Sequence, residues 1–167
     1  MSDLYTELLV QRKTPASAKI LKVLMIVATV FAGLLGFTFM PLALVVFVGM
    51  IILCYFKLSS FDLEFEYLYV NGELDVDKIM SKTKRKRVAS IEMEKVELVA
   101  PLKSHELDYY RNNKGIKIVD YSSGEEDHDI YAIILNGEKG MQMIYFEPNN
   151  IILNDMRRIA PRKVKTM

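Results

Sequence analysis

The residues best placed to do chemistry in this chain are a dense group of cations between Ser81 and Ser90. This segment reads "SKTKRKRVAS", and its basic residues are Lys82, Lys84, Arg85, Lys86 and Arg87. Basic runs of this kind bind nucleic acid, nuclear import receptors or anionic membrane surfaces, or pair with carboxylates on neighbouring strands. The remainder of the chain decides among these alternatives.

Other reactive side chains are scattered. His105 and His128 each lie in a polar stretch with no second His or Cys nearby, and the acidic run "SSGEEDHD" (residues 122–129) lacks the spacing of a calcium-binding loop. No glycine-rich phosphate loop, nucleophile elbow or zinc-protease motif occurs. The sequence therefore predicts a turn between strands for 122–129, and no catalytic residue, metal site or cofactor. We expect that the protein is not an enzyme.

Overall charge argues against nucleic acid as a partner. The 167 residues carry 22 Lys and Arg against 21 Asp and Glu, so the net charge is only +1. A single cysteine, Cys54, excludes an internal disulfide and a cysteine-based zinc site.

The strongest pattern is an uncharged apolar run. No Asp, Glu, Lys, Arg or His lies between Lys22 and Lys57. A membrane helix needs roughly 20 apolar residues, so the run is too long for one span and suits two short ones. Pro41 favours a break near its middle. We expect a transmembrane hairpin over residues 18–58, with helices at about 18–39 and 42–58.

Basic residues flank this run on both sides. A single span would place one basic flank outside, whereas a hairpin keeps both in the cytoplasm, as the positive-inside tendency requires. The sequence thus predicts a multi-pass protein of the inner (cytoplasmic) membrane, with both termini in the cytoplasm. These flanking cations are Arg12, Lys13, Lys19 and Lys22 before the run, and Lys57 and the 82–87 cluster after it.

The first residues, 1–17, are expected to form a short amphipathic segment on the inner membrane surface. Ser2 or Asp3 would cap a short helix whose apolar side chains share a face, and Thr14 followed by Pro15 would begin the first membrane helix. A disordered leader is the alternative.

Beyond the membrane run, the sequence alternates as strands do. Apolar residues recur at every second position in "FDLEFEYLYV", and Asn71-Gly72 is a strong hairpin signal. If the chain turns again at Lys82-Thr83, then Lys84 and Lys86 share a sheet face with Asp75 and Asp77.

Four to five further short strands are predicted before a terminal helix. The alternation changes phase near Glu94-Lys95, which indicates a turn or bulge, and "GIKIVDY", "DIYAIILN" and "GMQMIYFE" read as the last three strands. The expected domain covers residues 61–167 with about seven antiparallel strands, curled into a barrel or sandwich, and a helix at about 148–160.

This arrangement resembles the pleckstrin-homology-like (PH-like) fold, and the chain is similar to bacterial proteins that place such a domain after a two-helix membrane hairpin. The segments "LEFEYLYVNGELDVDKIM", "KTKRKRV" and "APRKV" resemble a 6106-type domain-of-unknown-function family of short two-span membrane proteins. The resemblance implies an α+β membrane protein and brings no catalytic residues.

The leading hypothesis is a non-catalytic membrane-anchored adaptor or accessory subunit whose PH-like domain lies on the inner leaflet and contacts anionic lipid. A subunit that binds a partner peptide in a groove beside the terminal helix is the alternative, a homo-oligomer is a further arrangement, and an enzyme with an unrecognised site ranks below them. Lys84 and Lys86 would form ion pairs with the carboxylates of the adjacent strand, because odd and even positions face opposite sides of a strand. The predicted membrane contacts are Lys82, Arg85, Arg87, Arg12, Lys13, Lys19, Lys22 and Lys57.

Overall fold

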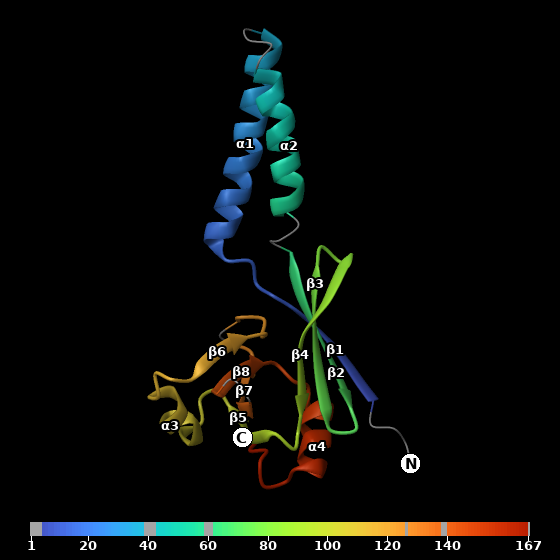
Figure 1. The fold of residues 1–167 in the computed structure, drawn as a ribbon, viewed down its shortest axis with the longest axis vertical. Coiled ribbons are helices and arrows are strands. Elements are labelled where there is room, and N and C mark those ends of the chain that lie inside the picture. Colours follow the sequence, from blue (N-terminus) through green and yellow to red (C-terminus); the bar gives the residue numbers. More distant parts are fainter. Residues whose placement is uncertain (1–4, 39–42, 59–61, 126, 138–139, 167) are drawn as a thin grey trace. The chain divides into compact units, whose positions relative to one another are not determined.

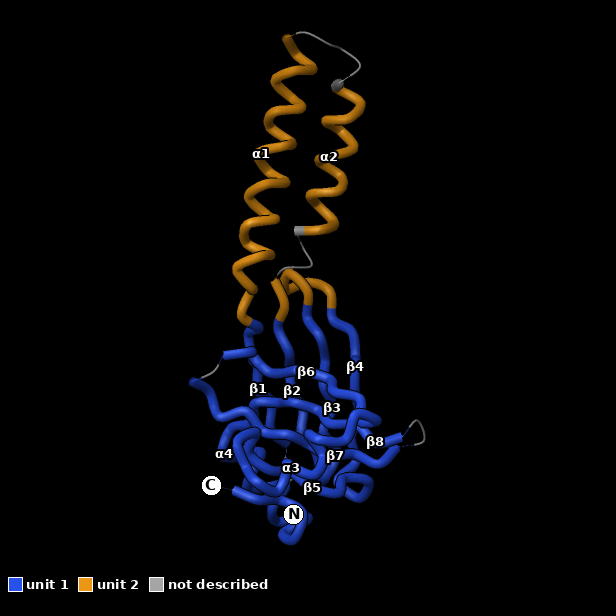
Figure 2. Tube along the Cα trace, turned by 90° about the vertical axis from the view of Figure 1, so that its left-hand side faces the viewer, with its two compact units in different colours: residues 1–12, 64–79, 85–167 blue, residues 13–63, 80–84 orange. Residues whose placement is uncertain are grey.

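The computed structural model describes residues 5–38, 43–58, 62–125, 127–137 and 140–166. The chain is a mixed α+β structure with two apolar helices near the N-terminus and two β-sheets (Figure 1). It divides into two compact units (Figure 2). We call residues 1–12, 64–79 and 85–167 the sheet unit, and residues 13–63 and 80–84 the helical unit.

The helical unit contains α1 (Ala16–Thr38) and α2 (Ala43–Leu58), so the two predicted helices are confirmed within two residues of their expected bounds. They pack closely where glycines allow it: a Cβ on Gly36 would lie 2.9 Å from Leu44 Cδ2. α1 is long and apolar enough to cross a membrane, whereas the described apolar part of α2 is shorter. Pro41, the expected break, lies outside the described residues.

The first sheet has the strand order β1-β2-β3-β4. It consists of β1 (Tyr5–Gln11), β2 (Leu63–Val70), β3 (Glu73–Met80) and β4 (Lys84–Glu92). The predicted β2–β3 hairpin is confirmed, since Asn71 and Gly72 form the turn with φ angles of 48° and 96°.

Strand β1 corrects the expectation of a short helix in residues 1–17. The apolar residues of this segment satisfy a helical face, but Leu8 and Val10 also alternate, and the open edge of β2 supplies partners for the backbone. β1 pairs antiparallel with β2 from Tyr5 opposite Val70 to Gln11 opposite Glu64. Tertiary pairing therefore decides the local structure.

The second sheet has the order β5-β7-β8-β6 and consists of β5 (Val96–Pro101), β6 (Lys117–Asp120), β7 (Tyr131–Gly137) and β8 (Gly140–Phe146). The seven predicted strands correspond to β2–β8. The expectation that all the strands are antiparallel is wrong, because β6 runs parallel to β8. The two sheets do not form a closed barrel, which was one of the two expected arrangements. β6 and β7 are consecutive in the chain but pair with opposite edges of β8. β7 and β8 then form an antiparallel hairpin.

Helix α4 (Asn150–Ile159) confirms the predicted terminal helix and completes the core of the sheet unit. The Asn149 side chain accepts a hydrogen bond of 2.9 Å from the Ile152 amide and caps the helix. Ile152 and Met156 are fully buried in one cluster with Tyr67 and Phe146. A short 3₁₀ turn (His105–Leu107) and α3 (Asp108–Arg111) lie between β5 and β6.

Candidate functional site

The two arginines of the basic cluster bind carboxylates inside the sheet unit. Arg85 forms an ion pair with Glu66 and lies 3.8 Å from Asp77. Arg87 Nη1 lies 2.7 Å from Asp75, and its Nε donates to Asp77 Oδ1 at 3.2 Å. The prediction that Lys84 and Lys86 form ion pairs with these carboxylates is therefore wrong, because Arg85 and Arg87 form them instead.

The length of one turn explains this reversal. The prediction placed a two-residue turn at Lys82-Thr83, but β3 ends at Met80 and β4 begins at Lys84, so three residues connect them. Ser81 and Lys82 both have positive φ, 48° and 56°. One additional residue sends every following side chain to the opposite face of the strand, because the period of a strand is two.

Glu66 is the most deeply buried of the carboxylates that these two arginines contact. It lies in the middle of the first sheet and is only 4% exposed. Burial raises the pKa of Glu66, a hydrogen bond with Glu7 raises it further, and the charge of Arg85 opposes this rise. The hydrogen bond to Asp77 raises the pKa of Arg87. Both arginines thus neutralise acidic side chains of the sheet.

The other predicted contact residues fall into two groups. Arg12 donates to the Asp120 carbonyl at 2.9 Å and to its Oδ2 at 3.0 Å, and lies over the Phe65 ring. Arg12 therefore ties the end of β1 to the end of β6. The lysines at positions 13, 19, 22, 57 and 82 are exposed and belong to the helical unit. Membrane contact remains a prediction for all of these residues.

The sheet unit contains a cleft of about 1040 Å³. Its walls are the segment after β5, the connection between β6 and β7, Tyr145 of β8, and the C-terminal residues Lys165 and Thr166. The charged residues that line it are Lys103, Glu106, Asp120, Glu125, Asp127, His128, Asp129 and Lys165.

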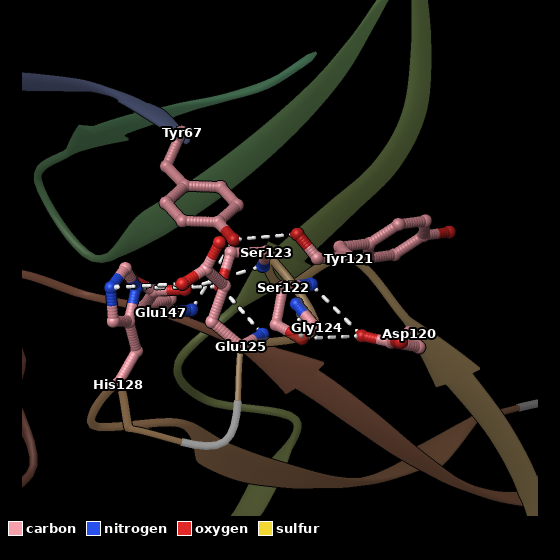
Figure 3. A network of polar contacts seen from close by, with 9 residues as sticks. All are labelled: Tyr67, Asp120, Tyr121, Ser122, Ser123, Gly124, Glu125, His128 and Glu147. Carbon is pink, nitrogen blue, oxygen red and sulfur yellow. Dashed lines mark hydrogen bonds and ion pairs between the residues drawn. The ribbon is translucent and has the colours of Figure 1, made fainter. Parts of the chain in front are cut away.

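Hydrogen bonds hold the connection between β6 and β7 in place (Figure 3). Asp120 Oδ1 accepts from the Ser122 amide at 2.9 Å and from its hydroxyl at 2.7 Å. The buried Tyr67 hydroxyl donates to the Tyr121 carbonyl at 2.7 Å and accepts from the Glu147 amide at 3.2 Å. Tyr67 on β2 therefore links the first sheet to the start of this connection and to the residue that follows β8.

His128 joins the same network through its Nδ1 atom. Its Nδ1 lies 2.6 Å from Glu147 Oε1 and 3.4 Å from Ser123 Oγ. A nucleophile relay needs the hydroxyl and the carboxylate on opposite nitrogens of the ring. Since both approach the same nitrogen, the arrangement orders the loop. The predicted turn over 122–129 is confirmed, with Glu126 outside the described residues.

No metal-binding group is present in the part of the chain that the structure describes, where no three His, Cys, Asp or Glu side chains converge. The other histidine, His105, lies away from His128 in the chain, with a fully exposed side chain 3.3 Å from Asp108.

The edge of the second sheet beside α4 is occupied by the chain itself. The Val99 amide donates to the Lys163 carbonyl, and the Lys165 amide donates to the Val99 carbonyl, both at 2.8 Å. Val164 between them is buried. Lys163 Nζ also donates to the carbonyls of Met93 and Glu94. A peptide could add to this edge of β5 only by displacing residues 163–165.

The contacts of Tyr67 and Lys163 could not be predicted from the sequence. Alternation identifies Tyr67 as a core residue but does not reveal that its hydroxyl bridges two segments far along the chain. Lys163 belongs to a basic tail that reads as solvated, yet its ammonium group closes the turn between β4 and β5.

Comparison with known proteins identifies a family. A family model described as a bacterial PH-like domain (DUF6106) matches residues 2–166. No curated protein and no solved structure matches the chain.

Proposed function

The chain belongs to the bacterial PH-like domain family DUF6106, and on that premise we propose that it is a non-catalytic module anchored in the inner membrane by α1 and α2. Both helices cross the bilayer, and both termini lie in the cytoplasm. The PH-like domain then serves at the inner leaflet as an adaptor or accessory subunit.

The observation that carries this proposal is the pairing of β1 with β2. β1 precedes α1, β2 follows α2, and Gln11 is the Cα partner of Glu64. The chain between them must therefore leave the sheet and return to the same point. If α1 alone crossed the membrane, β1 and β2 would lie on opposite sides and could not pair. Two crossings keep them together.

The same pairing argues against α1 as a cleaved signal sequence. Cleavage after α1 would remove β1, with its buried residue Val10, from the sheet. Charge supports the orientation, because lysines cluster at the N-terminal end of α1 and the C-terminal end of α2. The 23 residues of α1 span about 35 Å as a helix, enough for a hydrocarbon core of about 30 Å.

A non-catalytic role is supported by the geometry of the cleft, where the His128, Glu147 and Ser123 contacts fix a loop. The alternative, a partner peptide bound beside α4, has less support, because residues 163–165 already occupy the edge of β5. Within the described residues, β1 pairs only with β2, so its outer edge is open to a partner strand. Purification in mild detergent tests this, since a stoichiometric partner would favour the adaptor role over a solitary one.

Cysteine cross-linking in isolated membranes tests the anchoring directly. Antiparallel Cα partners lie about 4.5–5.5 Å apart, within reach of a disulfide. In a Cys54→Ala background, Gln11→Cys with Glu64→Cys should cross-link on mild oxidation, in protein that resists carbonate extraction. Glu7→Cys with Glu64→Cys, four residues out of register, is the matched control. Membrane-inserted protein that never cross-links at positions 11 and 64 would contradict the hairpin.

A further inference from the structure

The charges of this protein are segregated between its two units. Residues 13–63 and 80–84 include six lysines and a single acidic residue, Asp62, although the whole chain is almost neutral. All six ammonium-bearing side chains are exposed. These lysines are Lys13, Lys19, Lys22, Lys57, Lys82 and Lys84.

The β3–β4 turn belongs to the helical unit because it contacts the segment that follows α2 (Figure 2). The Ser81 amide donates to the Asp62 carbonyl at 2.9 Å. Lys84 Nζ lies 6.0 Å from the centre of the Phe56 ring, in the last turn of α2. Lys82 and Lys84 are thus held beside the C-terminal end of α2, whereas Arg85 and Arg87 turn to the sheet.

Helix packing brings the remaining lysines to the same end of the hairpin. Gly36 contacts Leu44 near the tip, and Thr29 Oγ1 lies 3.3 Å from Cys54 Sγ further down. The helices are therefore antiparallel, and the first turns of α1, with Lys19 and Lys22, lie at the end where α2 reaches Lys57.

Aromatic side chains mark this end as the level of a membrane interface. Tyr55 and Phe56 pack edge to face in the last turn of α2 and are 72% and 62% exposed. Aromatic rings are enriched where the hydrocarbon core meets the headgroups, and lysines beyond them extend towards the phosphates. The arrangement places ammonium groups at headgroup depth around a helix end.

We propose that this end of the helical unit is a binding site for the headgroups of anionic phospholipids, with Lys82 and Lys84 as its principal ligands and Lys57 beside them. The inference rests on the proposed membrane anchoring and adds the identity of the lipid partner. Ammonium groups attract the phosphates as point charges. Each lysine should raise the local preference for anionic lipid roughly fivefold at low salt.

The test is the lipid selectivity of the full-length protein in bilayers of phosphatidylcholine. Spin-labelled phosphatidylglycerol and spin-labelled phosphatidylcholine each report the fraction of lipid that the protein immobilises. The unchanged protein should prefer phosphatidylglycerol severalfold at low salt and lose the preference as salt rises. Lys82→Gln with Lys84→Gln should lose most of it, whereas Lys82→Arg with Lys84→Arg should keep it. Lys114→Gln with Lys117→Gln, which removes the same charge from the sheet unit, should leave it unchanged.

Equal selectivity in the unchanged protein and the Lys82→Gln, Lys84→Gln variant overturns the lipid site while leaving the anchor intact. An equal loss in the Lys114→Gln, Lys117→Gln control also overturns it, because total charge would then be the cause. If no immobilised lipid forms around the unchanged protein, the membrane anchor itself fails, and the lipid site fails with it.

Discussion

Gln11 and Glu64 face each other as Cα partners across β1 and β2, although both helices lie between them in the sequence. The helical hairpin is therefore an insertion into the connection between two adjacent strands of one sheet. This geometry makes folding of the first sheet depend on the return of the chain through α1 and α2, because β1 is synthesised before α1 and finds its partner only after α2.

Strand β1 should contribute measurably to the stability of the sheet. Val10 is 8% exposed and packs in the core, whereas Leu9 on the same strand is 53% exposed. Val10→Thr places a hydroxyl in an apolar site and should lower the free energy of unfolding by about 1–3 kcal/mol. Leu9→Thr is the control and should change it little. Thermal unfolding of the full chain in detergent measures both, and similar shifts for the two variants would contradict the assigned faces of β1.

Two buried tyrosines of β2 should respond in opposite ways to loss of the hydroxyl. Tyr67→Phe leaves the Tyr121 carbonyl and the Glu147 amide without their partner and should cost about 1–3 kcal/mol. The Tyr69 hydroxyl is buried and has no hydrogen-bond partner among the described residues, and burial raises the pKa of Tyr69 to about 12. Tyr69→Phe should therefore be neutral or stabilising. Equal destabilisation by both changes, measured by denaturant unfolding, would show that the network of Figure 3 has no special role.

The turn at Ser81–Thr83 shows where reasoning from sequence succeeded and where it failed. The helices, the Asn71-Gly72 hairpin, the strands β2–β8 and the cap of α4 follow from local patterns, because apolar periodicity and turn residues act over a few positions. The face occupied by Arg85 and Arg87 depends on a single residue of turn length, which composition does not determine. β1 has no such local signature, because its structure depends on the partner strand β2, which follows α1 and α2 in the chain. The Lys163 contacts likewise arise only when distant segments meet.

Arg87 should stabilise the sheet more than its neighbour Lys86. Arg87→Gln leaves the buried Asp77 and the partly buried Asp75 without their closest cation, so it should lower the free energy of unfolding. Lys86→Gln is the matched control, since Lys86 is exposed on the same strand and loses the same charge. Unfolding in detergent compares them. A larger effect at Lys86 would restore the opposite assignment of faces.

Glu66 should make stability depend on pH. Its pKa is raised in the folded protein above the ordinary value of 4.5, first by burial, so the folded state holds the proton more tightly than the unfolded state. The contribution of Glu66 is therefore favourable in acid and is lost as pH rises from about 4.5 through the raised pKa. Glu7, Asp77 and Arg85 surround this carboxyl and remain in the variant.

Glu66→Gln removes this titration, so the variant should gain stability relative to the unchanged protein as pH increases. The difference in melting temperature between the two, followed from pH 4 to 7, is the measurement. A difference that stays constant with pH would mean that Glu66 does not titrate abnormally.

Close helix packing should require glycine at position 36. A Cβ there would lie 2.9 Å from a Leu44 side-chain atom and 3.1 Å from the Leu44 amide nitrogen, whereas a Cβ on Gly49 meets nothing within 4 Å. Gly36→Val should separate the helices and lower thermal stability in detergent, while Gly49→Val should not. If both variants behave alike, the observed α1–α2 contact does not form in detergent.

The topology of the full-length protein in living bacteria tests the central claim most directly. Reporters that are active only in the cytoplasm or only outside the inner membrane are fused ahead of Met1 and after Met167. Cytoplasmic activity is expected at both positions, and the external reporter should be active only when inserted at Pro41. External activity at either terminus would contradict the two-span hairpin.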